Sequence, residues 1–94
     1  MKAELIFRQR AQLDDTSLAE LVIWQVPRPL AGSAHHFKYS LAYVENEVCV
    51  IRYDNEVGKG DHRHIGRKEM PYAFVDMDQM MVDFWTDVAG WRRE

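Results

Sequence analysis

The C-terminal part of the chain carries a regular stripe of apolar residues. Six of them recur at the spacing i, i+3, i+4, i+7, i+8 and i+11: Met77, Met80, Met81, Phe84, Trp85 and Val88. This spacing places all six on one face of an α-helix, which has to bury them against a second layer. Asp76 and Gln79 form a capping-box pair at the start of this helix. Val75 is placed to pack against Met80, and Gly90 predicts the helix end.

The polar side of the same predicted helix is acidic. Its four aspartates are expected to face solvent: Asp76, Asp78, Asp83 and Asp87. The first two also suit the positive N-terminal end of a helix dipole. The apolar stripe is therefore interpreted as core, and the aspartates as the outer surface.

The rest of the chain reads as strands separated by turn signals. Apolar and polar residues alternate, or β-branched and aromatic residues gather, in four segments: 3–8, 18–26, 37–44 and 48–53. Turn-forming residues at 14–17 and the prolines Pro27 and Pro29 interrupt them. We predict an α+β fold, an antiparallel sheet of four to five strands with one C-terminal amphipathic helix packed on it.

Length and composition limit the class of protein. A chain of 94 residues with 47% hydrophobic residues suits a single domain over residues 1–94 and excludes a two-domain enzyme. The formal net charge of −3 gives no strong cationic field, so a nucleic-acid site has to be a local patch. The lone Cys49 excludes an intramolecular disulfide, and the N-terminus lacks the apolar run of a signal peptide. We expect a cytoplasmic protein in which Cys49 is a small buried hydrophobe.

The stretch 54–67 has no hydrophobic periodicity. It contains three glycines, two histidines and mixed charges, so we expect a long surface loop or a distorted hairpin. Between Arg52 and Lys68 there are five basic residues and three acidic ones, a local charge of +2. Long irregular loops in small domains often carry function. This stretch is therefore the first place to look for a site.

All four histidines fall in two pairs, His35 with His36 and His62 with His64. The first pair precedes the third predicted strand, and the second pair follows the fourth. A hairpin between these strands joins their far ends, so the start of one and the end of the other come together. We expect the two histidine pairs to approach one edge of the sheet.

These residue types match the needs of RNA cleavage through the ribose 2′-hydroxyl, which requires a base, an acid and cations for the phosphate. The residues predicted to carry catalysis are His62, His64, Lys59 and Asp61, with the histidines as acid and base and the aspartate as their orienting group. The residues predicted to bind the substrate are Arg52, Arg63, Tyr53, His35, His36 and Lys38. Glycines on either side of Lys59 allow backbone donors to approach a phosphate. This scheme needs no cofactor and no metal.

Three other interpretations stay open. A polar, glycine-rich stretch is often only a solvated connection. Two histidines two apart on a strand point the same way and, with His35 or His36, suit a divalent metal and metal-dependent hydrolysis. A non-catalytic module that binds protein or nucleic acid is the third, with contacts from Trp24, Trp85 and Trp91.

Several segments of the chain resemble the TumE family of toxins from bacterial and archaeal toxin-antitoxin systems. The segments are IWQVP at 23–27, HHFKY at 35–39, RYDNE at 52–56, GKGDHRHIG at 58–66 and PYAF at 71–74. The resemblance implies a small toxin encoded beside a helix-turn-helix antitoxin that blocks it. Together with the residue chemistry, it predicts an mRNA interferase-like ribonuclease acting on RNA, and a homodimer is compatible with the chain. The catalytic roles above rest on residue chemistry alone.

Overall fold

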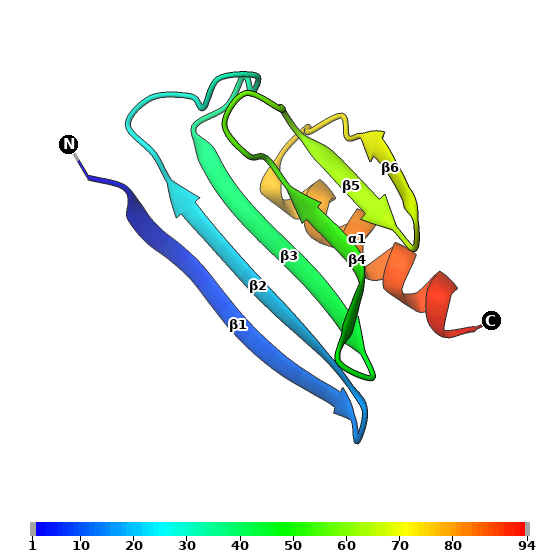
Figure 1. The fold of residues 1–94 in the computed structure, drawn as a ribbon. Coiled ribbons are helices and arrows are strands. Elements are labelled where there is room, and N and C mark those ends of the chain that lie inside the picture. The colour runs from blue at the N-terminus through cyan, green and yellow to red at the C-terminus, as the bar shows by residue number, and fades with distance from the viewer. Residues whose placement is uncertain (1, 94) are drawn as a thin grey trace.

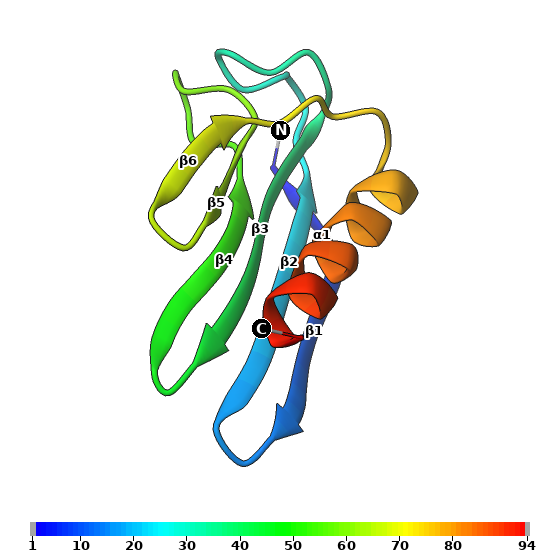
Figure 2. The ribbon, with the colours of Figure 1, turned by 90° about the vertical axis from the view of Figure 1, so that its right-hand side faces the viewer.

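The computed structural model describes residues 2–93, which form one antiparallel sheet and one helix (Figure 1). The strands are β1 (Glu4–Asp14), β2 (Ser17–Gln25), β3 (Phe37–Glu45), β4 (Val48–Asp54), β5 (His62–Ile65) and β6 (Lys68–Pro71). Each strand pairs antiparallel with the next, so their order in the sheet is their order in the sequence. Helix α1 (Met77–Arg92) lies across one side of the sheet (Figure 2). The predicted α+β fold with its C-terminal helix is confirmed.

The sheet has six strands, more than the four to five predicted. The additional hairpin, β5 and β6, turns at Gly66, whose φ is 62°. Its strands have four residues each and carry polar side chains on both faces, so apolar alternation is absent. Alternation marks a strand only where one face is buried. For the same reason β1 continues to Asp14, well beyond the predicted segment 3–8.

The core lies between α1 and the face of the sheet that it covers, here called the helix face. Alternate residues of β2, β3 and β4 point into it: Ala19, Leu21, Ile23, Tyr39, Leu41, Tyr43, Ile51 and Tyr53. Met80, Phe84 and Val88 of α1 are buried against them, as the helical spacing predicts. The opposite face of the sheet, here called the open face, is not covered by α1 (Figure 2).

Helix α1 begins as predicted but ends later. The Asp76 carboxylate accepts a hydrogen bond from the Gln79 backbone N–H at 2.7 Å, so Asp76 is the N-cap. Val75 is 71% exposed, and the predicted hydrophobic staple is absent. Gly90 does not end the helix, which runs on to Arg92. The predicted end is wrong because tertiary contacts of the last turn outweigh the low helix propensity of one glycine.

Two of the aspartates predicted to face solvent instead accept hydrogen bonds from tyrosines, one in β4 and one in the segment that follows β6. The Tyr72 hydroxyl donates to Asp83 at 2.5 Å, and the Tyr53 hydroxyl donates to Asp87. Arg63 Nη1 also donates to Asp87, at 3.1 Å. Burial, and then these carboxylates, raise the pKa of both tyrosines, so their hydroxyls remain donors. The helical pattern gave no sign of this, because tyrosine carries its polar atom at the end of an apolar ring.

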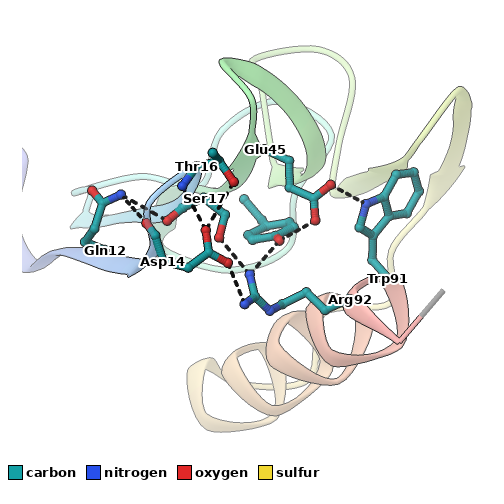
Figure 3. A network of polar contacts seen from close by, with 8 residues as sticks. Gln12, Asp14, Thr16, Ser17, Glu45, Trp91 and Arg92 are labelled. Atoms are coloured by element: carbon teal, nitrogen blue, oxygen red, sulfur yellow. Dashed lines mark hydrogen bonds and ion pairs between the residues drawn. The ribbon is translucent and has the colours of Figure 1, made fainter.

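The last turn of α1 is fastened to the turns at one end of the sheet (Figure 3). Arg92 Nη1 donates to Ser17 Oγ at 2.7 Å and to Tyr43 Oη at 2.9 Å. Its Nη2 donates to Asp14 Oδ2 at 2.9 Å. The neighbouring Trp91 indole donates to a carboxylate at the end of β3, at 3.2 Å. These contacts explain why the helix continues past its glycine.

This network makes stability depend on the charge of Asp14. The Thr16 backbone N–H, the adjacent serine hydroxyl and the Arg92 guanidinium hold the pKa of Asp14 well below its ordinary value of 3.8. A carboxyl with a lowered pKa stabilises the fold fully above its ordinary pKa, and this contribution declines steadily as the pH falls from the ordinary value toward the lowered one. Asp14→Asn is therefore expected to lower the Tm at about pH 7 and to differ much less from the wild type at about pH 2. Thermal unfolding at both pH values tests this, and an equal deficit at both would contradict it.

Candidate active site

Strand pairing gathers a polar cluster on the open face of the sheet. Asp54 lies opposite His62, and Arg52 lies opposite His64, in the register of β4 and β5. Residues opposite one another, and residues two apart in one strand, share a face. The intervening Tyr53 is fully buried in the core. The four side chains Arg52, Asp54, His62 and His64 thus form one cluster, called here the histidine patch.

His62 is held in a fixed orientation from both ring nitrogens. Its Nδ1 lies 3.0 Å from the Gly60 carbonyl oxygen, and because a carbonyl only accepts, Nδ1 carries the hydrogen. Its Nε2 lies 2.5 Å from Asp54 Oδ1. That oxygen is buried and makes no hydrogen bond, so the contact has the distance of an ion pair without the alignment of a hydrogen bond. His62 is only 6% exposed.

His64 is the accessible imidazole of the patch. Its ring centroid lies 5.2 Å from that of His62, in an edge-on arrangement. Its side chain is 36% exposed, and its Nδ1 is 3.7 Å from Glu69 Oε2, a long contact to an exposed carboxylate. Such a pair restrains the ring only weakly. The patch therefore combines one fixed imidazole with one adjustable imidazole.

A cavity of about 390 Å³ adjoins the histidine patch. It is lined by Cys49, Arg52, Asp54, Glu56, Lys59, His62, His64 and Gly66. Lys59 is exposed there and lies 3.8 Å from the Glu56 carboxylate. A larger cavity of about 860 Å³, between the β5–β6 turn and the end of α1, is lined by no histidine. Among the predicted residues, Arg52, Lys59, His62 and His64 thus share one cavity.

Two cavity residues differ from what the sequence suggested. Asp54 was not predicted as a site residue, although it lies two positions after Arg52 and shares its face. Extending the predicted strand 48–53 by one residue would place Asp54 on the same face as Arg52. Cys49, expected to be buried, is exposed. A register shift between Tyr43 and Val44 pairs Cys49 with Val44, which moves it out of the core alternation.

Tyr53 and Arg63 lie on the other side of the sheet. Tyr53 is fully buried, and Arg63 Nη1 donates to its hydroxyl at 3.1 Å. Both side chains contact Asp87 of α1. Because neighbouring residues of a strand point to opposite faces, neither side chain joins the histidine patch. Their contacts are those of helix attachment.

Asp61 and His35 form a separate cluster. Asp61 accepts hydrogen bonds from Ser33 Oγ at 2.5 Å, from His35 Nε2 at 2.6 Å and from Tyr39 Oη at 2.8 Å. The Phe37 backbone N–H donates to His35 Nδ1 at 3.1 Å, so the His35 proton is on Nε2. Burial, and then the Asp61 bond, raise the pKa of Tyr39. The two histidine-bearing segments do meet through Asp61, but its oxygens are occupied by these three donors.

His36 and Lys38 lie outside the patch. His36 Nδ1 is 3.3 Å from the Val26 carbonyl oxygen, at the end of β2. Lys38 is exposed on the open face, opposite Trp24, on the strand next to β4. Lys38 is therefore placed to extend the cationic surface of the open face toward β2. His36 belongs to the loop between β2 and β3.

The family model described as Toxin TumE matches residues 2–92, nearly the whole chain. This chain belongs to the TumE family of toxins. The resemblance read from the sequence is confirmed, and with it the role of toxin in a toxin-antitoxin system, which implies an antitoxin partner. No curated protein and no solved structure matches the chain. Across residues 2–93 of this TumE toxin, no helix has the length and apolar character to cross a membrane.

Two loops of the TumE toxin pack backbone to backbone beside the patch. The Gly58 N–H donates to the Ala31 carbonyl at 2.8 Å. A Cβ on Gly32 would lie 2.7 Å from the Gly60 nitrogen, and a Cβ on Gly60 would lie 2.8 Å from the Gly32 oxygen. Glycine is needed at both positions because the two backbones touch. These glycines therefore position the loop that leads into β5 and His62.

Gly32→Ala is expected to destabilise the toxin much more than Gly58→Ala. The φ angles are 94° and 86°, a region in which a Cβ costs about 1–2 kcal/mol. A Cβ at Gly58 meets nothing within 4 Å, so this variant reports the φ cost alone. Gly32→Ala adds a backbone clash, for an expected loss of about 3 kcal/mol or more in urea denaturation. Equal losses in the two variants would show that the loop contact is dispensable.

Proposed function

We propose that this toxin is a metal-independent endoribonuclease in which His62 and His64 form the acid–base pair. The observation that carries the proposal is the pair itself: two imidazoles 5.2 Å apart on one face, beside a cavity that Arg52 and Lys59 also line. Acid–base cleavage of RNA needs a proton acceptor, a proton donor and cations for the phosphate. The histidine patch and Lys59 supply these groups from side chains alone.

The proposed reaction moves one proton at each histidine. One imidazole removes the proton of a ribose 2′-hydroxyl, and the 2′-oxygen attacks the adjacent phosphorus. The bond to the 5′-oxygen breaks, and the second imidazole, in its protonated form, gives this oxygen a proton. The products are a 2′,3′-cyclic phosphate and a free 5′-hydroxyl. Arg52 and Lys59 stabilise the negative charge on the phosphate oxygens.

Asp54 takes the orienting role in this scheme. Its carboxylate lies beside His62 Nε2 and compensates the charge that the ring gains with a second proton. Because the contact is not aligned as a hydrogen bond, a small shift of the Asp54 carboxylate frees Nε2 for a substrate that enters the cavity. Catalytic hydrogen bonds often align only when substrate is bound. Asp61, whose oxygens accept three other donors, supports the loop instead.

Purified toxin incubated with a mixed-sequence RNA oligonucleotide tests the proposal. We expect cleavage in EDTA, products with 2′,3′-cyclic phosphate ends, and loss of cleavage in His62→Gln and His64→Ala. Glu20→Gln is the matched control, because Glu20 is an exposed carboxylate on the open face, two strands away from Arg52. Cleavage that needs a divalent ion, or that survives both histidine substitutions, would contradict the proposal.

The proposal extends to the protein that inhibits the toxin and to the compartment in which the toxin acts. We propose that the antitoxin is a helix-turn-helix protein encoded beside the toxin, and that the pair acts in the cytoplasm, where RNA is the substrate. Membership of the TumE family supports the existence of the antitoxin. A toxin that only binds RNA or protein predicts loss of affinity in the histidine variants, whereas an enzyme predicts loss of turnover with affinity retained.

A further inference from the structure

The histidine patch contains the donor atoms of a metal site. Asp54, His62 and His64 each offer one ligand atom, and these atoms lie within 4.8 Å of one another. In the part of the chain that the structure describes, residues 2–93, this is the only group of three or more metal-ligating side chains so arranged. All three sit on the paired strands β4 and β5, which hold their backbones at a fixed spacing. The donors are thus supplied by the sheet, not by mobile loops.

The hydrogen bonding of His62 is that of a ligand imidazole. Metal-bound histidines commonly donate their other ring N–H to a backbone carbonyl, which fixes the ring and directs the free nitrogen at the ion. His62 Nδ1 donates to the Gly60 carbonyl at 3.0 Å in this way. The remaining nitrogen, Nε2, lies 2.5 Å from Asp54 Oδ1. An imidazole and a carboxylate are therefore aimed at the same point.

The Asp54 carboxylate gives a second reason for a cation at this contact. Its Oδ1 is buried and accepts no aligned hydrogen bond, and its close neighbour is the Nε2 atom of His62. A buried carboxylate oxygen without a partner is costly, and such groups in native proteins are normally paired or coordinate a metal. A cation between Asp54 and His62 would satisfy this oxygen and use the lone pair of Nε2 at once.

We propose that Asp54, His62 and His64 bind one divalent transition-metal ion of the Zn²⁺ type, and that the bound ion blocks RNA cleavage. Two imidazoles and one carboxylate suit Zn²⁺, Co²⁺ or Ni²⁺ better than Mg²⁺ or Ca²⁺, which prefer oxygen ligands. Three protein ligands leave a fourth position for water. The blocking effect rests on the proposed ribonuclease function, whereas the binding does not.

Only small movements are needed to close the site. Ligand distances of about 2.0–2.2 Å around a tetrahedral ion place neighbouring donors about 3.3 Å apart. The contact between Asp54 and His62 has to open slightly, and the half-exposed His64 has to turn inward. Its long contact to Glu69 offers little resistance. His62 thus serves as the fixed ligand, and His64 as the ligand that moves to complete the site.

Metal binding and acid–base catalysis exclude each other at this site. A histidine nitrogen that coordinates an ion has no lone pair to accept a proton and no proton to donate. If the ion occupies the ring nitrogens of both His62 and His64, neither imidazole can act on the 2′-hydroxyl or the leaving oxygen. The ion would therefore act as an inhibitor that a chelator removes.

The test uses the full-length toxin freed of metal and titrated with Co²⁺, whose visible absorption reports coordination without any assay of activity. We expect saturation at one ion per chain, and displacement by Zn²⁺. Asp54→Asn and His64→Ala are each expected to weaken binding by about 100-fold. Glu20→Gln, on the same face, is expected to bind as the wild type does, and thermal unfolding of each variant checks its fold.

The RNA oligonucleotide assay is then run on the same samples with one equivalent of Zn²⁺ and again after EDTA. Inhibition by Zn²⁺ with recovery in EDTA supports the proposal. Absence of saturable Co²⁺ binding by the wild type, or unchanged binding by both ligand variants, overturns the site. Cleavage that requires the ion overturns its inhibitory role and the metal-independent mechanism together. Specific binding without any cleavage overturns the ribonuclease function and leaves the metal site in place.

Discussion

Cells that express the His64→Ala variant are expected to grow like cells without toxin, when both contain equal amounts of folded protein. Loss of a general acid or base lowers turnover by about 10²–10⁴-fold, and no other side chain of the cavity replaces an imidazole near neutral pH. His64 suits this test because its side chain is 36% exposed, so its removal leaves no buried hole. Colony counts after induction, in cells without antitoxin, measure the effect.

His62 is buried, so its role is tested with a substitution of similar size that keeps a polar group. His62→Gln keeps an amide near the Gly60 carbonyl and the Asp54 carboxylate, and is expected to abolish growth arrest equally. Glu20→Gln, an exposed change on the same face, should remain fully toxic. Both histidine variants should still bind the antitoxin, which shows that they fold. Undiminished growth arrest in both would refute histidine catalysis, and lost antitoxin affinity would favour a binding toxin.

The fold was predictable where one face of an element is buried. Alternation in 37–44 and the stripe of α1 follow directly from burial against a common core, and both elements form as expected. The hairpin of β5 and β6 carries polar residues on both faces, so it leaves no periodic trace. The end of α1 depends on contacts of Arg92 with residues nearly eighty positions away, which no local pattern contains.

The site was partly predictable for the same reason. His62 and His64 share a face because they are two apart in a strand, and the strand pairing places Arg52 beside them. Arg63 was assigned to the same cleft because β5 was not recognised as a strand, so that its alternation was unknown. Tyr53 lies in the predicted strand 48–53, whose alternation already places its side chain on the face opposite that of Arg52. Once β5 is a strand, Arg63 has to point away from the two histidines. The contacts of Asp61 come from a loop and were not derivable from spacing.

Asp61→Ala is expected to lower the free energy of unfolding by about 3 kcal/mol, although Asp61 was predicted to act in catalysis. The substitution leaves three donors without their acceptor, on Ser33, His35 and Tyr39, and each unsatisfied group costs about 1–3 kcal/mol. The Asp61 side chain is only 9% exposed, so water does not readily replace it. Urea denaturation followed by fluorescence measures the loss, which is a large share of the stability of a small domain.

Glu56→Ala is the matched control, an exposed carboxylate in the same loop whose removal is expected to cost less than about 0.5 kcal/mol. Ser33→Ala should cost less in the Asp61→Ala background than in the wild type, because the two residues share one hydrogen bond. If Asp61 positions the loop, the folded fraction of the variant retains cleavage in proportion to its amount. If the Asp61→Ala variant keeps its stability but cuts no RNA, Asp61 has the catalytic role that the sequence predicted. His35, the imidazole that Asp61 binds, would then be a further acid–base residue.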